Sequence, residues 1–472
     1  PVYDDSDADY AGLFAAMHST QGPVQSALNT ICPPSDGQLW LVNITGQNRD
    51  GEIVELRSDA DMSGMAIRTA SGEGVLQSIV RANGDKRCVA PVADVPALGW
   101  SAAQLGLAAH TPKSGLSVSE THLENDLIAV RFDENGDISS IIDKTSAREL
   151  IQSGKRANWL VAYEDKPKNY DAWDIDQYFE EKSWPLSDAS VTIEVVETGP
   201  HRAALRIERQ YARSRIVQVI SLQDGQMQIE FDTEIDWQER QTLLKTGFPF
   251  DLNVSETRAE IQFGHVKRPS HKNTSWDQAR FETSMHRWVD MSEPDFGAAL
   301  LTDCKYGYDA VEQTVRLTLL KGSNVPDPDA DLGLHHFRYA LLLHQGEKDV
   351  SEVVRAAETF NTPVLVHGAL ENTVMDRLPL DPGVYFAVMD NPDLTLETVK
   401  LVENGNDVIM RIFEHSNRRS AGRLQFAMTV SQVTETDLME RTSGKSYEIA
   451  DNGVDLSFRP FEIKTLRVTI DR

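Results

Sequence analysis

From residue 38 onward, apolar and polar residues alternate in short runs separated by turn residues, and this period of two is the strongest constraint on the fold. Residues 38–43 (QLWLVN) and 51–56 (GEIVEL) show the pattern clearly. Because successive side chains of a strand point to opposite faces of a sheet, such runs turn one side to a core and the other to solvent. We therefore expect a mainly β chain built of antiparallel sheets.

The middle of the chain predicts a hairpin followed by a large antiparallel sandwich. Residues 127–132 and 138–142 are predicted strands, and Asn135-Gly136 between them suits a type I′ turn, which needs two positive φ angles. Longer alternating runs follow at regular spacing, as in a sandwich: residues 191–196, 203–208, 216–221 and 227–231. Further strands are predicted near the C-terminus: residues 408–413, 424–428 and 463–468.

Two stretches have a helical period. Between residues 7 and 28, apolar side chains recur at helical spacing behind an acidic start, where a helix dipole favours anions. A lone helix needs a partner for its apolar stripe, so we interpret it as the last piece of a helical domain whose remainder lies upstream. Residues 350–360 form the other candidate, which Pro363 should end because the residue before a proline avoids the α region.

Length and charge narrow the class of protein. At 472 residues, the chain should hold about three domains of roughly 150 residues each. The 73 acidic residues outnumber the 46 basic ones, and the resulting formal charge of -27 disfavours nucleic acid and anionic lipid as partners. No apolar run of about 18 residues occurs, so no membrane span is predicted.

The cysteines and histidines do not form a metal-binding pattern. Cys32, Cys88 and Cys304 lie far apart without CxxC or CxxH spacing, and reduced thiols of a cytoplasmic protein are the simplest interpretation. His335 and His336 are consecutive, so on a strand they would point to opposite faces and could not share an ion. We predict no metal site, no cofactor and no catalytic residue within this chain.

The segment YDAWDID at residues 170–176 combines aromatic faces, which stack on sugar rings, with carboxylates, which accept hydrogen bonds from hydroxyls. A carbohydrate-binding surface is one interpretation. The alternative is an ordinary strand with Trp173 and Ile175 inward and Asp174 and Asp176 outward. The two aspartates are poor candidates for a glycosidase acid and nucleophile, because such groups lie roughly 5 to 9 Å apart across a substrate and usually come from different segments.

Several longer strings resemble family 38 α-mannosidases, especially the bacterial and cytosolic branch. They run in a similar order from the middle of the chain to its end: RPSHKNTSWDQARFE at 268–282, FGAALLTDCKYGY at 296–308, PDPDAD at 326–331, TDLMER at 436–441 and PFEIKTL at 460–466.

The resemblance implies an order of domains. Residues 1–30 would be the last helix of a helical bundle, and residues 31–114 a small β-sandwich. Residues 115–360 would form a large antiparallel supersandwich like that of galactose mutarotase, and residues 361–472 a C-terminal β domain.

The resemblance also implies chemistry. In this family an aspartate attacks the anomeric carbon with retention, a second carboxylate acts as acid and base, and a zinc ion grips sugar hydroxyls. The segments that carry those groups would precede Pro1, so zinc is expected in the full-length enzyme and catalysis by this chain alone is not. The chain would pack on its own N-terminal catalytic domain, act on mannose-containing glycans and possess the homo-oligomeric tendency of the family.

Two stretches are candidates to form a wall of the substrate pocket, with core or turn roles as the alternative. The candidate substrate-binding residues are Tyr170, Asp171, Trp173, Asp174, Lys305, Tyr306 and Tyr308. Two other functions stay open: a free-standing, non-catalytic carbohydrate-binding protein, and a scaffold whose exposed seam only packs against a neighbour.

Overall fold

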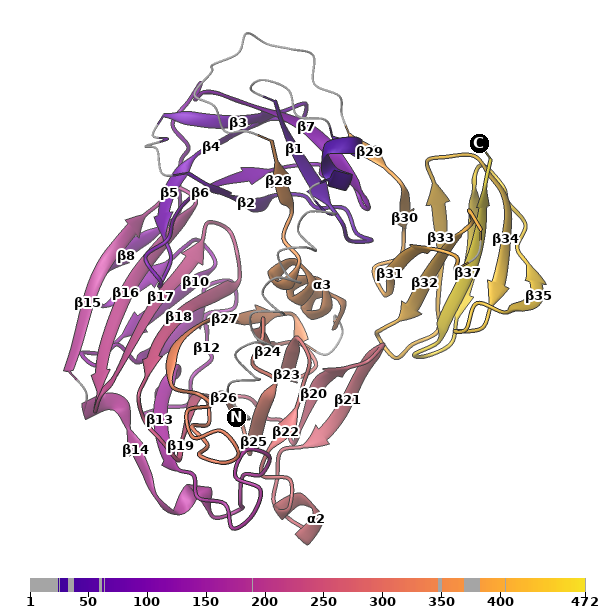
Figure 1. Ribbon diagram of the computed structural model, residues 1–472. Coiled ribbons are helices and arrows are strands. Elements are labelled where there is room, and N and C mark those ends of the chain that lie inside the picture. The colour runs from indigo at the N-terminus through magenta and orange to yellow at the C-terminus, as the bar shows by residue number, and fades with distance from the viewer. Residues whose placement is uncertain are drawn as a thin grey trace.

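The protein is described from a computed structural model that covers residues 24, 26–32, 38–58, 62, 64–188, 190–346, 350–368, 383–403 and 405–471. Within these residues strands dominate, and the predicted mainly β class is confirmed (Figure 1). Residues 26–31 are helical, but the rest of the helix predicted at 7–28 lies almost entirely outside the described residues. None of the described helices is long and apolar enough to cross a membrane.

The first β unit consists of a six-stranded and a three-stranded sheet packed on each other, with Leu41, Val54 and Ile67 in their shared core. The larger sheet contains β1 (Gln38–Asn43), β3 (Met65–Thr69), β4 (Glu73–Val75), β7 (Gly99–Leu107), β28 (Leu365–His367) and β29 (Val384–Tyr385). The smaller sheet contains β2 (Glu52–Arg57), β5 (Gln77–Val80) and β6 (Lys86–Val92). Since β28 pairs with β1 and β29 with β7, strand pairing crosses the boundary predicted after residue 360.

The large sandwich that follows is built around a nine-stranded antiparallel sheet in the order β15-β16-β17-β18-β27-β24-β23-β20-β21. The predicted strands at 191–196, 203–208, 216–221 and 227–231 are confirmed as parts of β15 to β18. The bounds are β15 (Ser190–Thr198), β16 (Arg202–Tyr211), β17 (Ser214–Gln223), β18 (Gln228–Trp237), β20 (Glu256–Ile261), β21 (Gly264–Pro269), β23 (Trp288–Ser292), β24 (Gly297–Thr302) and β27 (Gly333–His344).

A six-stranded and a five-stranded sheet complete the large sandwich. The hydrophobic core of the sandwich lies between these two sheets and the nine-stranded sheet. Phe231 and Tyr339 of the nine-stranded sheet stack with ring centroids 4.8 Å apart, and both rings contact Phe248 of the six-stranded sheet. The six-stranded sheet contains β13 (Trp159–Glu164), β14 (Ser183–Pro185), β19 (Thr242–Pro249), β22 (Thr283–Ser284), β25 (Gly307–Val311) and β26 (Thr314–Leu320). The five-stranded sheet contains β8 (Ser117–Ser119), β9 (His122–Glu124), β10 (Ile128–Phe132), β11 (Ile138–Asp143) and β12 (Arg148–Glu149).

The hairpin between β10 and β11 forms as predicted, but its turn differs. Gly136 has a φ of 72°, whereas Asn135 is not among the residues with positive φ, so the predicted type I′ turn is wrong. The reason lies one residue earlier, where the Asp133 carboxylate accepts hydrogen bonds from the backbone N–H groups of Asn135 and Asp137 at 3.0 and 3.1 Å. This side-chain bonding closes the loop with a single left-handed residue.

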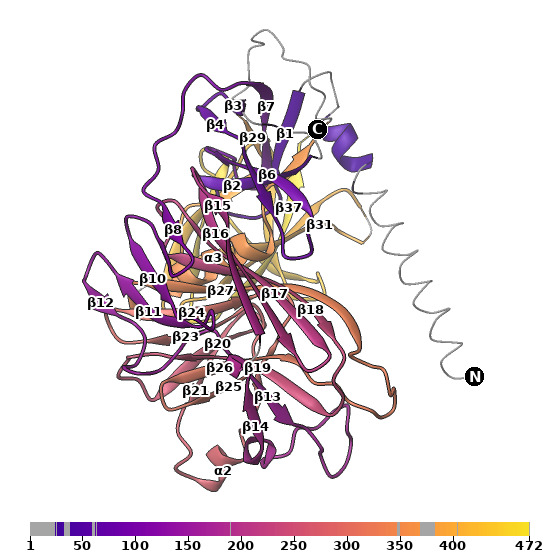
Figure 2. The same cartoon turned by 90° about the vertical axis from the view of Figure 1, so that its left-hand side faces the viewer.

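Helix α3 (Val350–Asn361) confirms the helix predicted at 350–360 and lies where the β units meet (Figures 1 and 2). Its inner face, with Val353 and Ala357, packs against Leu301 and Leu342 of the nine-stranded sheet. The helix ends before Pro363, as expected. Its opposite side is left to face the first β unit.

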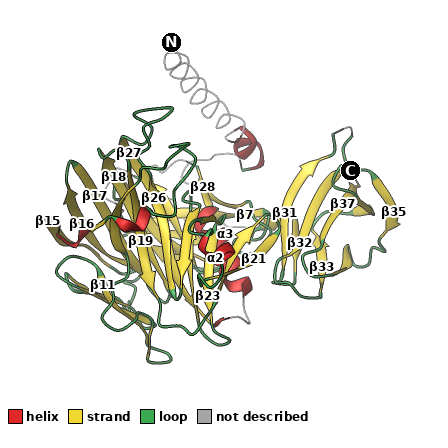
Figure 3. Cartoon of the chain, turned by 90° about the horizontal axis from the view of Figure 1, so that it is seen from below, coloured by secondary structure: helices red, strands yellow, loops and turns green. Residues whose placement is uncertain are grey.

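The C-terminal sandwich stands to one side of the large sandwich (Figure 3). A three-stranded and a five-stranded sheet enclose a separate core that includes Leu396, Met410 and Leu466. The sheets contain β30 (Ala387–Met389), β33 (Ser420–Phe426) and β36 (Gly453–Phe458), and β31 (Leu394–Leu401), β32 (Val408–Glu414), β34 (Val430–Thr436), β35 (Thr442–Ser446) and β37 (Ile463–Ile470). The predicted C-terminal strands correspond to β32, β33 and β37.

Candidate functional site

The aromatic-acidic segment at 170–176 is a surface turn and not a strand. The backbone N–H groups of Trp173 and Asp174 both donate to the Tyr170 carbonyl, at 2.8 and 2.9 Å, and Tyr170 itself has a φ of 54°. Tyr170 and Trp173 are each 71% exposed. The strand interpretation is therefore wrong, and the turn holds two aromatic faces out toward solvent.

Asp171 fastens this turn to the loop that follows β26. Its Oδ2 atom accepts hydrogen bonds from the backbone N–H groups of Asn324 at 2.6 Å and Val325 at 3.1 Å. The Lys321 ammonium donates to the Asp171 carbonyl at 2.6 Å and to Asp165 Oδ2 at 2.5 Å. Asp171 is thus a positioning residue for the turn, with one carboxylate oxygen occupied by backbone donors.

The other two aspartates of the segment differ in their surroundings. Asp174 is exposed. Asp176 accepts hydrogen bonds from the Tyr178 hydroxyl and from the Lys168 backbone N–H at 2.7 Å, and these bonds lower the pKa of the Asp176 carboxyl. Asp176 is therefore held as an anion within its own loop and does not form an opposed pair with Asp174.

In the second predicted stretch, residues 305–308, some side chains are exposed and one is buried in the core. Tyr306 is exposed, whereas Tyr308 is only 1% exposed and its hydroxyl lies 3.2 Å from Thr257 Oγ1 and 3.1 Å from Arg268 Nη1. The Lys305 ammonium lies 4.5 Å from the centre of the Phe337 ring, and burial lowers the pKa of its amine. Tyr308 is thus a core residue, and Lys305 and Tyr306 form the surface part of this stretch.

The two predicted stretches border the same loop. Residues 321–325 bind Asp171 on one side, while Asp331, farther along the loop, accepts a hydrogen bond from the Gly322 N–H at 2.7 Å and interacts electrostatically with Lys305. Short elements nearby are η1 (Phe179–Glu181), η2 (Leu186–Asp188) and α2 (Ser275–Gln278). These segments and the start of β27 carry eight large exposed apolar side chains, six of them aromatic: Tyr170, Trp173, Tyr178, Trp184, Trp276, Tyr306, Val325 and Leu334. We call these eight residues the aromatic rim.

A buried ion cluster lies beneath the segments that carry the aromatic rim. The Lys245 ammonium, only 1% exposed, donates to Asp309 Oδ2 at 2.6 Å and to the Glu282 carboxylate. Arg316 contacts Asp309 Oδ1 at 2.8 Å and also pairs with Glu180 of η1. Burial alone would lower the pKa of Lys245, but Asp309 and Glu282 raise it, so the amine stays charged. The cluster joins β19, β25 and β26 to the covering segments around residues 180 and 282.

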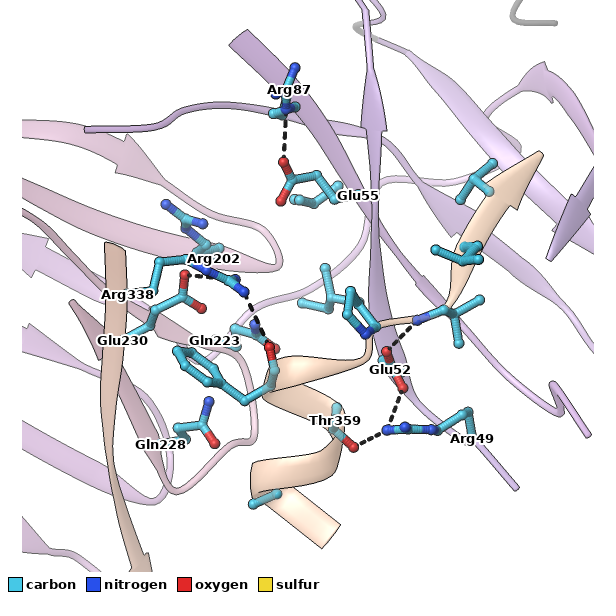
Figure 4. Close-up of a pocket in the computed structure, with 18 of the residues that line it drawn as sticks. Arg49, Glu52, Glu55, Arg87, Arg202, Gln223, Gln228, Glu230, Arg338 and Thr359 are labelled. Atoms are coloured by element: carbon cyan, nitrogen blue, oxygen red, sulfur yellow. Dashed lines mark hydrogen bonds and ion pairs between the residues drawn. The ribbon is translucent and has the colours of Figure 1, made fainter. Parts of the chain in front are cut away.

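A second candidate site, which the sequence did not reveal, is a cavity of about 1110 Å³ between the first β unit, the large sandwich and α3 (Figure 4). The polar lining of the cavity follows from the alternation of side chains between the two faces of each strand. Ile229 and Phe231 point into the sandwich core, so Gln228 and Glu230 of the same strand point into the cavity. In the same way, Val54 and Leu56 fill the core of the first unit, which leaves Glu55 facing the cavity.

Ion pairs cross the cavity and join its walls. Arg81 of the first unit contacts Glu230 of the sandwich at 2.8 Å and also pairs with Glu55. Burial would raise the pKa of Glu230, but Arg81 and Arg338 outweigh it and hold the pKa at about 2. Arg49 contacts the Thr359 hydroxyl and donates to the Thr362 carbonyl at 3.1 Å, which ties the first unit to the end of α3.

No motif marks this cavity in the sequence, because its residues come from loops and from many separate elements, among them β2, β6, β16, β17, β18, β27, β28 and α3. The only available signal was the polar half of each alternating strand. That signal is common to every half-exposed strand and does not show which polar faces meet.

The consecutive histidines of β27 bond to different groups. His335 Nε2 lies 2.8 Å from the Asp331 carbonyl, whereas His336 Nε2 lies 2.6 Å from Asp232 Oδ1, and this bond raises the pKa of His336. Among the residues that the structure describes, no group of three His, Cys, Asp or Glu side chains is arranged to hold a metal ion. The donor set therefore does not fit a zinc centre, and no reaction step through zinc is assigned to these residues.

Comparisons with known proteins identify the family of two regions of the chain. Residues 123–329 match the family model described as "Glycosyl hydrolases family 38 C-terminal domain", and residues 393–466 match "Glycosyl hydrolases family 38 C-terminal beta sandwich domain". The predicted resemblance is confirmed.

Curated relatives and a solved structure agree. The chain is 35% identical over 353 residues to "Alpha-mannosidase 2C1" of Mus musculus, covering 74% of this chain and 33% of that protein. It is 31% identical over 362 residues to "Alpha-mannosidase G" of Dictyostelium discoideum, covering 73% of this chain and 32% of that protein. An alpha-mannosidase structure from Enterococcus faecalis V583 matches with a TM-score of 0.70 at 16% identity, over 98% of this chain and 59% of that one, which shows the shared fold. The chain thus spans about one third of the length of these curated relatives.

Proposed function

Because this chain belongs to glycosyl hydrolase family 38, as part of that family's C-terminal region, we propose that it is the β-rich portion of an enzyme that hydrolyses terminal α-mannosides. The observation that carries the proposal is the match of two successive C-terminal family models, together with curated relatives that are themselves named alpha-mannosidases. The whole enzyme would work in the cytoplasm on mannose-containing glycans.

We propose that the whole enzyme is a zinc-dependent, retaining glycosidase. A retaining mechanism needs two carboxyl groups about 5 to 5.5 Å apart, one as nucleophile and one as acid and base. Zinc would supply a grip on sugar hydroxyls in a separate catalytic domain, while this chain contributes positioning. Neither Asp174 nor Asp176 is assigned to the chemistry, since Asp176 is bound within its own loop.

The part proposed for this chain is a wall of the substrate pocket and a surface on which the catalytic domain packs. The exposed faces of Tyr170 and Trp173 suit both the C–H face of a sugar ring and an apolar protein surface. Asp171 and Lys321 hold the turn in place, so the two rings are presented by a fixed backbone. Lys305 and Tyr306 border the same loop and would complete this wall.

The test compares this chain with a protein that also contains the family's catalytic domain, using an aryl α-mannoside and a titration of zinc. We expect turnover only from the longer protein, with zinc required. In the longer protein, Trp173→Ala should raise KM more than it lowers kcat, because the ring binds sugar and does not react. Full activity from the 472 residues alone would show that the catalytic groups have been misassigned.

A free-standing carbohydrate-binding protein is the second candidate, favoured by the exposure of Tyr170 and Trp173. The isolated chain would then bind mannose at this turn, and Trp173→Ala would abolish binding without any catalytic partner. If the isolated chain binds no sugar at the turn and only packs on a neighbour, the scaffold function is favoured instead. Homo-oligomer formation, also proposed, can be measured on the same samples by sedimentation.

A further inference from the structure

We propose that the cavity between the first β unit, the large sandwich and α3 is a second, non-cleaving binding site for a short, neutral oligosaccharide. The site is separate from the aromatic rim, which lies on the segments around α2 and β14 at the far end of the large sandwich (Figure 1). The inference goes beyond the proposed hydrolysis and does not depend on it.

The size of the cavity suits a ligand of a few sugar units. Ligand cavities for small molecules usually measure about 300 to 1,000 Å³. The cavity here measures about 1110 Å³, so it exceeds what one monosaccharide needs. Its walls belong to units that the Arg81 and Arg49 contacts tie together, which keeps the space between them defined.

The charge of the lining favours a neutral ligand. Seven arginines and six acidic residues line the cavity, which is nearly balanced in a chain of formal charge -27. The central arginines are already paired: Arg81 with Glu230, Arg202 with Glu197 at 2.9 Å, and Arg87 with Glu55 at 3.0 Å. A charged ligand would have to compete with these ion pairs. The hydroxyl groups of a sugar, in contrast, can accept hydrogen bonds from the guanidinium N–H groups and donate to the carboxylate oxygens without breaking the pairs.

Neutral amides supply the hydrogen bonds that a sugar needs. The side chains of Gln223 and Gln228 lie on the same wall as Glu230 and Arg338 (Figure 4), and no hydrogen bond joins either amide to another described side chain. On the first β unit, Gln47 also lines the cavity.

Apolar side chains lie beneath the polar lining and support it. The ring of Phe360 lies 4.7 Å beneath the Arg338 guanidinium, and Val364 and Leu342 also line the space. Arg338 donates to the Phe360 carbonyl at 3.1 Å, so ring and guanidinium are fixed relative to each other. The polar groups of this wall are therefore held on a fixed support.

Calorimetric titration of the 472-residue chain with mannotriose tests the proposal. We expect saturable binding that weakens about tenfold in the Gln223→Ala, Gln228→Ala double variant, since each lost hydrogen bond to a neutral group has a modest net effect. Ala356→Trp, which places a large ring on the cavity side of α3, should prevent binding. Gln210→Ala, an exposed glutamine of the same sandwich outside the cavity, should bind as the parent chain does.

Competition experiments and two further variants also test the proposed binding site. Competition by maltotriose supports a site for polyhydroxylated ligands in general, whereas stronger binding of inorganic phosphate overturns the neutral ligand. Trp173→Ala removes any binding at the turn, so the mannotriose binding that remains in this variant is that of the cavity and should disappear when Ala356→Trp is added. No binding by a folded parent chain, or equal binding by the Ala356→Trp variant, overturns the proposal whatever the hydrolysis assay shows.

Discussion

Replacing Lys245 by methionine tests whether the buried ion cluster stabilises the segments that carry the aromatic rim. Methionine keeps most of the length of the lysine side chain and removes its charge. In the native cluster, Lys245 and Arg316 face the carboxylates of Glu282 and Asp309. After the substitution, Asp309 keeps its bond to Arg316, whereas Glu282 keeps only the Thr318 hydroxyl as a partner.

The expected loss in the free energy of unfolding follows from the carboxylate that is left without its cation. Removing one partner of a buried pair costs roughly 3 to 5 kcal/mol, and the lower end applies here because Glu282 is not fully enclosed. For a unit of this size about 3 kcal/mol lowers the melting temperature by roughly 6 to 12 °C. Burial already raises the pKa of Glu282 in the native protein, so in the variant this carboxyl should take up a proton more readily and the deficit should shrink at low pH.

Thermal unfolding monitored by tryptophan fluorescence measures the effect. A second variant, Lys245→Met with Glu282→Gln, should recover about half of the loss because Asp309 keeps its bond to Arg316. Lys267→Met, which removes an exposed pair with Glu256 on the same sandwich, should cost less than about 1 kcal/mol. If Lys245→Met melts like Lys267→Met, or if Glu282→Gln deepens the loss, the cluster does not stabilise the fold in the way described.

Three further predictions concern pH, backbone conformation and the surface turn. Burial lowers the pKa of His415 to about 4, below its ordinary 6.5, so its contribution is complete above pH 6.5 and is lost as the pH falls toward 4. Relative to His415→Gln, the native chain should lose about 3 kcal/mol in urea unfolding between pH 7 and pH 4, and equal pH slopes would contradict this. Gly136→Ala should melt lower than Gly154→Ala, because both glycines have positive φ but only at Gly136 would the new Cβ meet a side chain, Ile207 at 2.8 Å; equal melting would show that the contact relaxes. Asp171→Ala should speed proteolysis near residue 170 while the melting temperature stays within a few degrees, and unchanged cleavage would mean that the turn does not depend on this carboxylate.

The strands and α3 were predictable because their information is local. Alternation marks which side chains of β16 to β18 enter the core, and Pro363 marks where α3 ends. The β10-β11 turn shows the limit, since Asn135-Gly136 permits a type I′ turn but the Asp133 carboxylate bonds the loop into another form. A side chain outside the dipeptide decided the conformation.

The candidate sites were predictable only in part, for a related reason. The aromatic and acidic composition of residues 170–176 identified a surface segment, but exposure of Trp173 depends on the bonds between Asp171 and a loop about 150 residues away. Tyr308 belongs to a similar string of polar and aromatic residues, yet its hydroxyl bonds Thr257 inside the core. The cavity was not predictable at all, because it exists only where the unmarked polar faces of separate strands meet.

The return of the chain to its first sheet has a practical consequence for anyone dividing this protein into pieces. A fragment that stops before residue 361 loses β28 and β29, so one side of β1 would be left with unpaired N–H and C=O groups. Open strand edges of this kind recruit other chains. Fragments designed from linear boundaries should therefore precipitate, whereas joining residues 38–107 to a copy of residues 363–385 through a short linker should give a piece that stays in solution.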